Sequence, residues 1–220
     1  MKRLHNNQYQ MITRVDDFLS KSVRLFPDHT AAVEVLELLR SGHAKLSEFL
    51  GTRVASELTL RSVSDALKAA RESLFTLLDA MHRTARAVGV HKFYVTTRVR
   101  NQALINSARG FKEEATRMKD QLVFHGLPAD FIESLQARVE TFERAIVEHG
   151  AAKSVRAGCI EEFEKTLKFT LDQVIRLDAL VFNTLADDAM VMKAWNAARR
   201  VEFPTRPKAS EPAPEPAPTA

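Results

Sequence analysis

The chain has 220 residues, a formal net charge of +4 and 45% hydrophobic residues, enough to bury the core of one or two domains. Its one cysteine, Cys159, excludes an intrachain disulfide and a cysteine-based zinc site. No segment reaches the roughly 18 consecutive apolar residues of a membrane span, and no signal-peptide run follows the basic start, so we expect a cytoplasmic chain without a transmembrane segment.

Turn residues are scarce before the C-terminal tail. The chain has 7 glycines, and of its 8 prolines only Pro27 and Pro128 precede residue 204. This composition favours long helices. The clearest corner lies at Val123–Phe131, where Gly126 suits a helix C-terminus and Pro128 suits the first turn of the next helix. The Phe26-Pro27 step predicts a weaker corner of the same kind.

The N-terminal part of the chain shows two amphipathic stripes. The first predicts a helix over residues 6–25. The second predicts a helix from about residue 30 to Leu50, with Gly42 as a weak point inside it. Residues 51–60 fit either a frayed continuation of that helix or a loop.

A third helix is expected to begin at Ser62, because Ser62 and Asp65 resemble a capping box with Asp in place of the usual Glu or Gln. Its apolar stripe runs to Gly89, where we expect the helix to end. Residues 90–97 are rich in β-branched and aromatic residues. They predict a short extended crossover.

The second half of the chain carries the most regular heptads. Residues 101–125 predict one unbroken helix, because their apolar positions alternate four and three residues apart. A second helix is expected from Ile132 to His149, with Gly150 ending it. The longest helix is predicted over 154–186, and a last short helix around Trp195 is expected to fold back onto the others.

These elements predict an all-α fold, an antiparallel helical bundle of about six long helices plus a short C-terminal helix. Sustained heptads also fit an extended intermolecular coiled coil, but the predicted breaks favour the bundle. We expect a single domain over 1–203 and a disordered Pro/Ala/Glu-rich tail over 204–220. A faint similarity between 1–95 and 98–187 suggests two three-helix pseudo-repeats, although shared helical periodicity would also produce it.

Motifs for chemistry are sparse. Asp79 and His82 form the single acid-x-x-His pair, whereas a carboxylate-bridged metal bundle needs two, so we expect no metal and no cofactor. No nucleophile motif or phosphate-binding loop occurs, which favours a non-enzymatic protein. Cys159, near the predicted start of the longest helix, is interpreted as a small hydrophobic residue rather than a reactive thiol.

Three histidines lie on predicted apolar seams: His43, His125 and His149. The latter two fall near predicted helix C-termini, where an imidazolium caps free carbonyls, and the alternative is a pH-sensitive or ligand-contacting cluster. Asp178 lies among apolar positions of the longest helix, so we expect an ion-pair partner from another helix.

The strongest functional signal is a stretch without acids. Residues 80–112 contain no Asp or Glu, while 113–172 hold more acids than bases. Candidate anion-binding residues in the acid-free stretch, interleaved with Phe93 and Tyr94, are Arg83, Arg86, Lys92, Arg98, Arg100, Arg109 and Lys112. Such residues suit phosphates of a nucleic acid or of a membrane surface. Alternatively, they pair with acidic helices of the same bundle.

Three functions are compatible with these features. We expect a non-enzymatic helical scaffold or protein–protein interaction protein, binding a protein partner or another copy of itself. One alternative is an anion- or nucleic-acid-binding module that uses residues 80–112. The other is a bundle that encloses a small apolar ligand along a phenylalanine-rich seam formed by Phe111, Phe142, Phe163 and Phe182.

Overall fold

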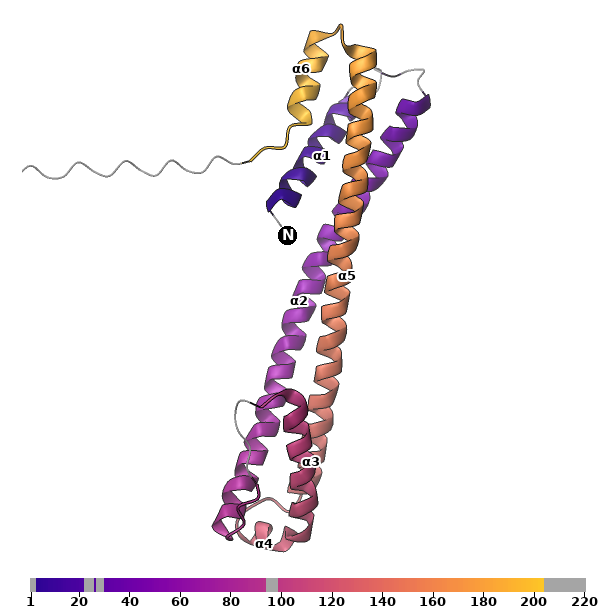
Figure 1. Cartoon of the computed structure of the whole chain (residues 1–220). Coiled ribbons are helices and arrows are strands. Elements are labelled where there is room, and N and C mark those ends of the chain that lie inside the picture. Colours follow the sequence, from indigo (N-terminus) through magenta and orange to yellow (C-terminus); the bar gives the residue numbers. More distant parts are fainter. Residues whose placement is uncertain (1–2, 22–25, 27–29, 94–98, 204–220) are drawn as a thin grey trace, which may run out of the picture. The chain divides into compact units, whose positions relative to one another are not determined.

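All regular structure in the described part of the chain is helical. The computed structural model describes residues 3–21, 26, 30–93 and 99–203, and it confirms the all-α prediction (Figure 1). Within these ranges the helices are α1 (Arg3–Lys21), α2 (Thr30–Ala87), α3 (Asn101–Arg117), α4 (Lys119–Phe124), α5 (Phe131–Leu185) and α6 (Ala189–Ala198). None of them is long and apolar enough to cross a membrane.

The chain divides into two compact units, and α2 and α5 contribute to both. Unit 1 comprises Met1–Glu48 and Phe163–Ala220, and unit 2 comprises Phe49–Glu162. Each unit therefore combines residues from both of the long helices. The pseudo-repeats and the single domain over 1–203 stay predictions. The tail at 204–220 lies outside the described residues.

The two longest helices continue through positions where breaks were predicted. α2 runs through residues 51–60 and Ser62, and α5 runs through Gly150. Of the two interpretations left open for residues 51–60, the helix continues and the loop is wrong. The capping box at Ser62 and the helix end at Gly150 were wrong. Glycine costs a helix interior only about 1 kcal/mol, which an otherwise helix-favouring sequence outweighs. The expected six long helices merge accordingly into fewer, longer ones.

One predicted helix is divided instead of merged. The heptad helix over 101–125 breaks at Met118, which separates α3 from α4. Met118 leaves the helical region, with φ −124° and ψ 27°, and its N–H donates to the carbonyl of Ala115. The break is a tightened turn, and the buried seam resumes at Leu122. Apolar spacing alone does not reveal such a break.

Two predicted helix ends are confirmed, at Gly89 and Gly126. Both glycines have positive φ, +81° and +99° respectively, a conformation that side chains disfavour. In each case the next N–H reaches back to the helix: Val90 donates to the Ala85 carbonyl at 2.9 Å, and Leu127 to the Leu122 carbonyl at 3.1 Å. These bonds satisfy carbonyls that the helix leaves free.

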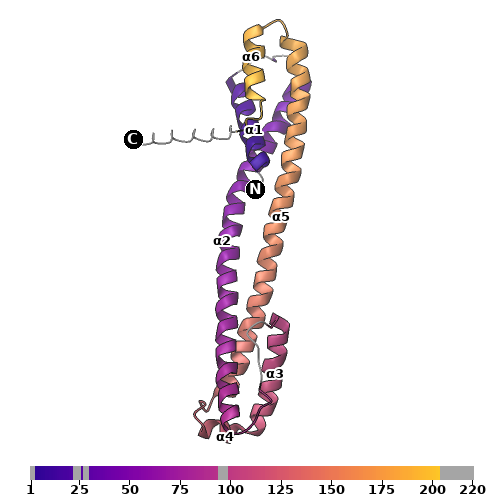
Figure 2. The same cartoon turned by 60° about the vertical axis from the view of Figure 1, so that its left-hand side comes forward.

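Unit 2 has an apolar core at the end that contains α3 and α4 (Figures 1 and 2). Its fully buried side chains come from α2, α3, α4 and α5 and from Phe93, which follows α2. The core residues that are fully inaccessible include Leu74, Leu78, Met81, Phe131, Leu135 and Phe142. Most of the apolar positions predicted for the helices over 101–125 and 132–149 are buried here.

Unit 1 packs α1 and α6 with the unit's parts of α2 and α5. A Cβ built on Gly42 in α2 would lie 2.2 Å from the Thr170 Oγ1 of α5, so glycine permits the close approach of these helices. Asp188 caps α6 by accepting from the N–H groups of Met190 and Val191. The short helix predicted around Trp195 is confirmed.

The partner expected for Asp178 is present in unit 1. Arg199 Nη1, just after α6, donates to Asp178 Oδ2 at 3.0 Å, and the fully buried Trp195 donates through Nε1 to Asp178 Oδ1 at 2.8 Å. The carboxylate therefore joins α6 to α5. The interpretation as a structural ion pair is confirmed.

Candidate functional site

Half of the described candidate cations form ion pairs within unit 2. Arg83 pairs with Asp79 at 2.7 Å, Lys92 with Glu114 at 3.2 Å, and Arg109 with Glu143 at 2.7 Å. A fourth, Lys112, donates to Gln136 Oε1 at 2.8 Å. These contacts support the alternative that the basic stretch pairs with acidic helices of its own bundle.

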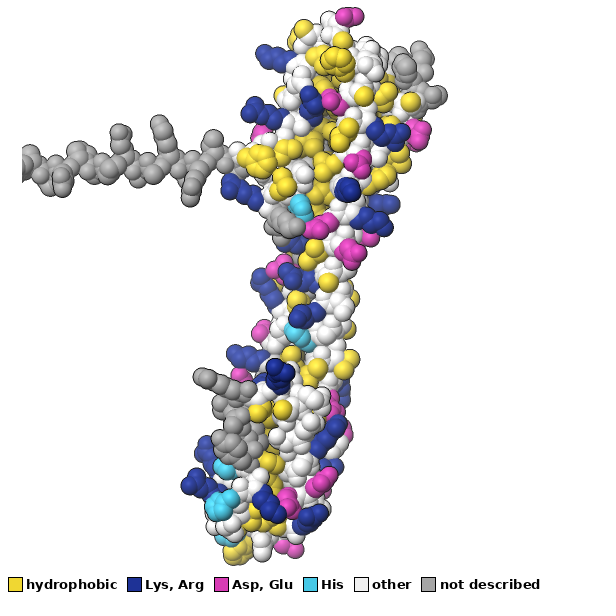
Figure 3. All heavy atoms as spheres, viewed as in Figure 1, with side chains coloured by type: hydrophobic (Ala, Val, Ile, Leu, Met, Phe, Trp, Pro, Cys, Tyr) yellow, Lys and Arg dark blue, Asp and Glu magenta, His cyan; other side chains and the backbone are white. Residues whose placement is uncertain are grey.

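The remaining candidate cations are Arg86, Arg98 and Arg100. Arg86, in the last turn of α2, and Arg100, just before α3, are exposed. Arg98 lies outside the described residues. On the face that Figure 3 shows, cations and carboxylates both lie at this end of the molecule. That distribution weakens the attraction of a polyanion.

The aromatic residue expected to contact bases is part of the core. Phe93 is only 1% exposed and packs edge-on against Phe111, with ring centroids 4.7 Å apart. Its carbonyl accepts a hydrogen bond from the His82 ring. Phe93 is therefore unavailable for stacking against a base, and Tyr94 lies outside the described residues.

The contact with Lys92 also affects the titration of its partner, Glu114. The pKa of Glu114 is lowered below its ordinary value, first by the hydrogen bond from Lys92 and then by the attraction of the same ammonium, with Arg117 adding to the effect. Arg117 Nη1 lies 3.2 Å from Glu114 Oε2. One carboxylate thus holds two cations at this end of the molecule.

A polar cluster joins α1 to α2 in unit 1. His43 Nδ1 lies 2.8 Å from Asp16 Oδ2, and His43 Nε2 lies 3.2 Å from the hydroxyl of Thr13. Arg40 lies 3.5 Å from the other oxygen of Asp16. One turn away, the hydroxyls of Tyr9 and Ser47 are 2.8 Å apart. The cluster therefore fastens the two helices along a polar seam.

The order hydroxyl, imidazole, carboxylate also occurs in nucleophilic catalysis, but two features oppose that role here. The Thr13 hydroxyl donates to the Tyr9 carbonyl of its own helix at 3.1 Å, so its proton is already engaged. Thr13 and His43 both lie in helix interiors, where backbone N–H groups are used within the helix and cannot form an oxyanion hole. The cluster therefore suits a structural role in joining α1 to α2.

Sequence reasoning singled out His43 but missed its partners. A usable signal exists: Tyr9, Thr13 and Asp16 are spaced four and three residues apart, as are Ser47, His43 and Arg40 in reverse order. Two polar stripes with the same spacing on neighbouring helices predict a polar seam. The apolar stripes alone do not reveal these polar positions.

Other predicted sites are dispersed. His125 follows α4 as its C-cap, as expected, whereas His149 lies inside α5, so its interpretation as a C-terminal cap was wrong. Cys159 also lies inside α5, far from any helix start, because Gly150 does not end the helix. No group of three His, Cys, Asp or Glu in the described part of the chain is placed to hold a metal ion.

The phenylalanines expected to line a ligand cavity do not share one. Phe111 and Phe142 lie in the core of unit 2, whereas Phe182, in unit 1, is 62% exposed. Phe182 therefore belongs to no interior seam. The ligand-enclosing alternative loses its main argument.

Unit 2 also contains a stretch in which α2 and α5 bury no side chain. We call residues 49–73 of α2 and 146–162 of α5 the central segments; Figures 1 and 2 show them side by side. The structure describes every residue in them, and none is buried. Their half-buried positions mix large apolar residues with polar or small ones. The apolar ones include Leu50, Leu60, Val63, Leu67 and Ile146, and the polar or small ones include Arg53, Ser56, Ser64, His149, Ala152 and Arg156.

Other large apolar side chains of the central segments point to solvent. Val54 and Leu58 of α2 are each 60% exposed, and Val147 and Val155 of α5 are 70% and 59% exposed. Figure 3 shows apolar side chains reaching the surface here among charged ones. The same helices also expose apolar side chains in unit 1, where Phe169, Ile175 and Phe182 of α5 are 45%, 68% and 62% exposed. In the central segments, apolar side chains thus occur on both the half-buried side and the solvent side, unlike the single apolar stripe of an amphipathic helix.

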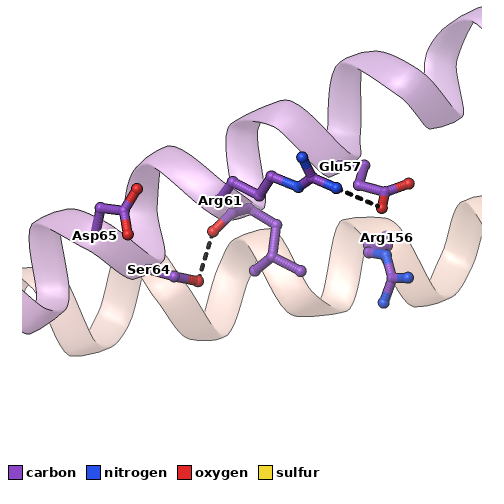
Figure 4. Close-up of a pocket in the computed structure, with 6 residues that line it drawn as sticks. Glu57, Arg61, Ser64, Asp65 and Arg156 are labelled. Atoms are coloured by element: carbon purple, nitrogen blue, oxygen red, sulfur yellow. Dashed lines mark hydrogen bonds and ion pairs between the residues drawn. The ribbon is translucent and has the colours of Figure 1, made fainter.

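A surface hollow of about 480 Å³ lies along the central segments. Glu57, Leu60, Arg61, Ser64 and Asp65 of α2 line it, and Arg156 closes it from α5 (Figure 4). The Arg61 side chain points back towards Glu57, and its Nη2 lies 3.5 Å from Glu57 Oε1. Asp65 lies one turn further along α2. The hollow is lined by charged groups of both signs, which suits contact with another protein surface better than a small apolar ligand.

Comparisons of the chain with protein-family models, curated proteins and solved structures found no match.

Proposed function

We propose that the chain is a non-enzymatic helical scaffold that binds protein through its central segments. The observation that carries this proposal is the outward placement of Val54, Leu58, Val147 and Val155 in segments where no side chain is buried. Exposed apolar groups rimmed by charges are typical of protein-binding surfaces. Within the molecule these side chains stabilise little.

The antiparallel bundle belongs to the same proposal. In unit 2, Arg138 of α5 donates to the Ser73 carbonyl of α2, whereas Arg156, further along α5, lies beside the earlier residues Glu57 and Asp65. Later residues of one helix thus meet earlier residues of the other, as in antiparallel neighbours.

Polyanion binding through residues 80–112 is the weaker candidate. Arg83, Lys92 and Arg109 are held by carboxylates, and these contacts would have to be exchanged for phosphates. Exposed ion pairs are worth only about 0.2–1 kcal/mol each, so exchanging these carboxylates for phosphates would cost little free energy. The placement of the three cations does not favour that exchange. The proposal therefore rests on the central segments.

Photo-crosslinking tests the proposal. A photoreactive amino acid replaces Val155 in one protein and the exposed Glu140, also on α5, in a control. We expect a discrete, nuclease-resistant protein adduct in native extract from position 155 only, and its loss on Val147→Glu. Equal adducts from both positions, or none from position 155, would contradict it, and a nuclease-sensitive adduct would favour the polyanion alternative.

A further inference from the structure

One face of the central α2 segment has the spacing of a helix-pairing surface. Its members, which we call the outer stripe, are separated alternately by four and three residues, and all are exposed. They are Val54, Leu58, Arg61, Asp65, Lys68 and Glu72. This alternation is the spacing at which one helix meets a second helix along its length. All six side chains are open to solvent, and Arg61 and Asp65 line the hollow that Arg156 of α5 also lines.

The centre of the outer stripe is complementary to itself in charge when the stripe is reversed, whereas its outer positions pair an apolar with a charged residue. If a second α2 runs antiparallel about a two-fold axis near Val63, Arg61 of each copy faces Asp65 of the other. Leu58 then faces Lys68, whose aliphatic stem covers apolar surface. A two-fold interface uses the same patch twice, so every favourable contact occurs in duplicate. The alternation of positive and negative charge makes both central contacts attractive.

The surface has room for the apolar members of the stripe. Beyond the hollow at Arg61 lies a second one of about 360 Å³, lined by Lys68, Arg71, Glu72, Phe75 and Thr76. The same two-fold arrangement places Leu58 and Val54 of one copy opposite this second hollow of the other. Phe75, half-buried and packed against the apolar core, supplies an apolar floor. Apolar side chains that are 60% exposed in one chain would thereby be covered.

The charges at the centre are free to be shared. The Arg61 side chain is 73% exposed, and its one contact, with Glu57, is a 3.5 Å pair within the same helix. Asp65 is exposed and makes no ion pair in the described part of the chain. Beside the stripe, Ala55, Ser62, Ala66 and Ala69 are small and exposed. A second helix can therefore approach the α2 backbone closely.

From the spacing, the reversed charge match and the two hollows, we infer that the chain forms a two-fold dimer in which the outer stripes of two α2 helices pack antiparallel. This inference rests on the proposed function, because it names a second copy of the chain as one protein that the central segments bind. The exposed Val147 and Val155 of α5 are outside the stripe and stay available for a further partner.

Charge-swap variants of the full chain test the dimer by sedimentation velocity. Arg61→Glu alone and Asp65→Arg alone each place like charges opposite one another twice, and we expect each to weaken self-association on the order of 10- to 100-fold. An equimolar mixture of the two variants restores opposite charges at both contacts. We therefore expect a mixed dimer from two variants that are each largely monomeric.

Arg83→Glu serves as the matched control, since Arg83 is an equally exposed α2 arginine with an i,i+4 partner but lies outside the stripe. It should leave the dimer unchanged, and helical circular dichroism should confirm that every variant folds. A wild-type chain that stays monomeric at about 100 µM, or a mixture of variants without mixed dimers, would overturn the inference. The adduct at position 155 would still test the proposed function independently.

Discussion

The same two helices behave differently in two regions of unit 2. At the α3 and α4 end, Leu74 and Phe142 are completely buried and belong to a continuous apolar core. In the central segments the half-buried positions include Arg53 and Arg156, and valines face solvent. The first region is built for stability. In the second region no side chain is buried, and its exposed apolar side chains are available for recognition.

The largest expected effect lies in the packed region. Phe142→Ala removes a fully buried ring from the core and should lower the free energy of unfolding by about 3–5 kcal/mol, because the lost burial is joined by a cavity. Chemical denaturation checks this value. A loss below about 1 kcal/mol would show that this end is packed no better than the central segments.

Replacing glycine by alanine should have opposite effects on stability at two positions of α2. Gly42→Ala brings a Cβ against Thr170 Oγ1 and should destabilise the chain by about 1–3 kcal/mol, with partial rescue by Thr170→Ala. Gly51→Ala meets no atom within 4 Å and should stabilise the chain by about 0.5–1 kcal/mol through helix propensity. Thermal unfolding of both variants measures the difference. Equal effects would contradict a close approach confined to Gly42.

The outward valines should matter little to folding. Val147→Ser with Val155→Ser replaces side chains that are 70% and 59% exposed, so the unfolding free energy of dilute purified protein should change by no more than about 0.5 kcal/mol. Val139→Ser, at a position only 5% exposed, is the matched control and should cost more. If the double variant lost as much stability as the control, these valines would belong to the core.

The smallest effect concerns the ion pair of Lys92. Because Lys92 lowers the pKa of Glu114, Lys92→Met should raise that pKa towards its ordinary value, as followed by NMR titration of the carboxyl carbon. A lowered folded-state pKa contributes stability above the ordinary carboxyl pKa, and the contribution disappears as the pH falls through the lowered value. An unchanged pKa in the variant would show that Lys92 is free for anions.

Much of the fold follows from local sequence signals. Gly89 and Gly126 mark true helix ends. Both have a positive φ, which glycine adopts more easily than any other residue, so the sequence can reveal such an end. Gly51 and Gly150 lie inside helices, since a lone glycine costs a helix interior only about 1 kcal/mol. Gly126 is followed by Pro128 and Gly89 by a run of β-branched and aromatic residues, and neither feature follows Gly51 or Gly150. The break at Met118 carries no glycine or proline and was not predictable from spacing.

The candidate site was less accessible to sequence reasoning. The basic stretch 80–112 was correctly identified as acid-free, but the carboxylates that pair with Lys92 and Arg109 come from positions beyond that stretch, and only the fold brings them near. Phe93 was predicted as a contact aromatic because burial cannot be read from a lone aromatic after a helix. Likewise, the outward turn of Val54 and Val155 depends on which side of each helix faces its neighbour.

The most direct test of the central claim is hydroxyl-radical footprinting of Val147 and Val155. In dilute purified protein both should be labelled strongly, and in native extract both should become protected, while the buried Val139 stays protected in each sample. That outcome would show that both side chains are exposed in the isolated chain and are covered when a protein partner is present. Protection already in the purified monomer, or equal labelling in both samples, would contradict the account.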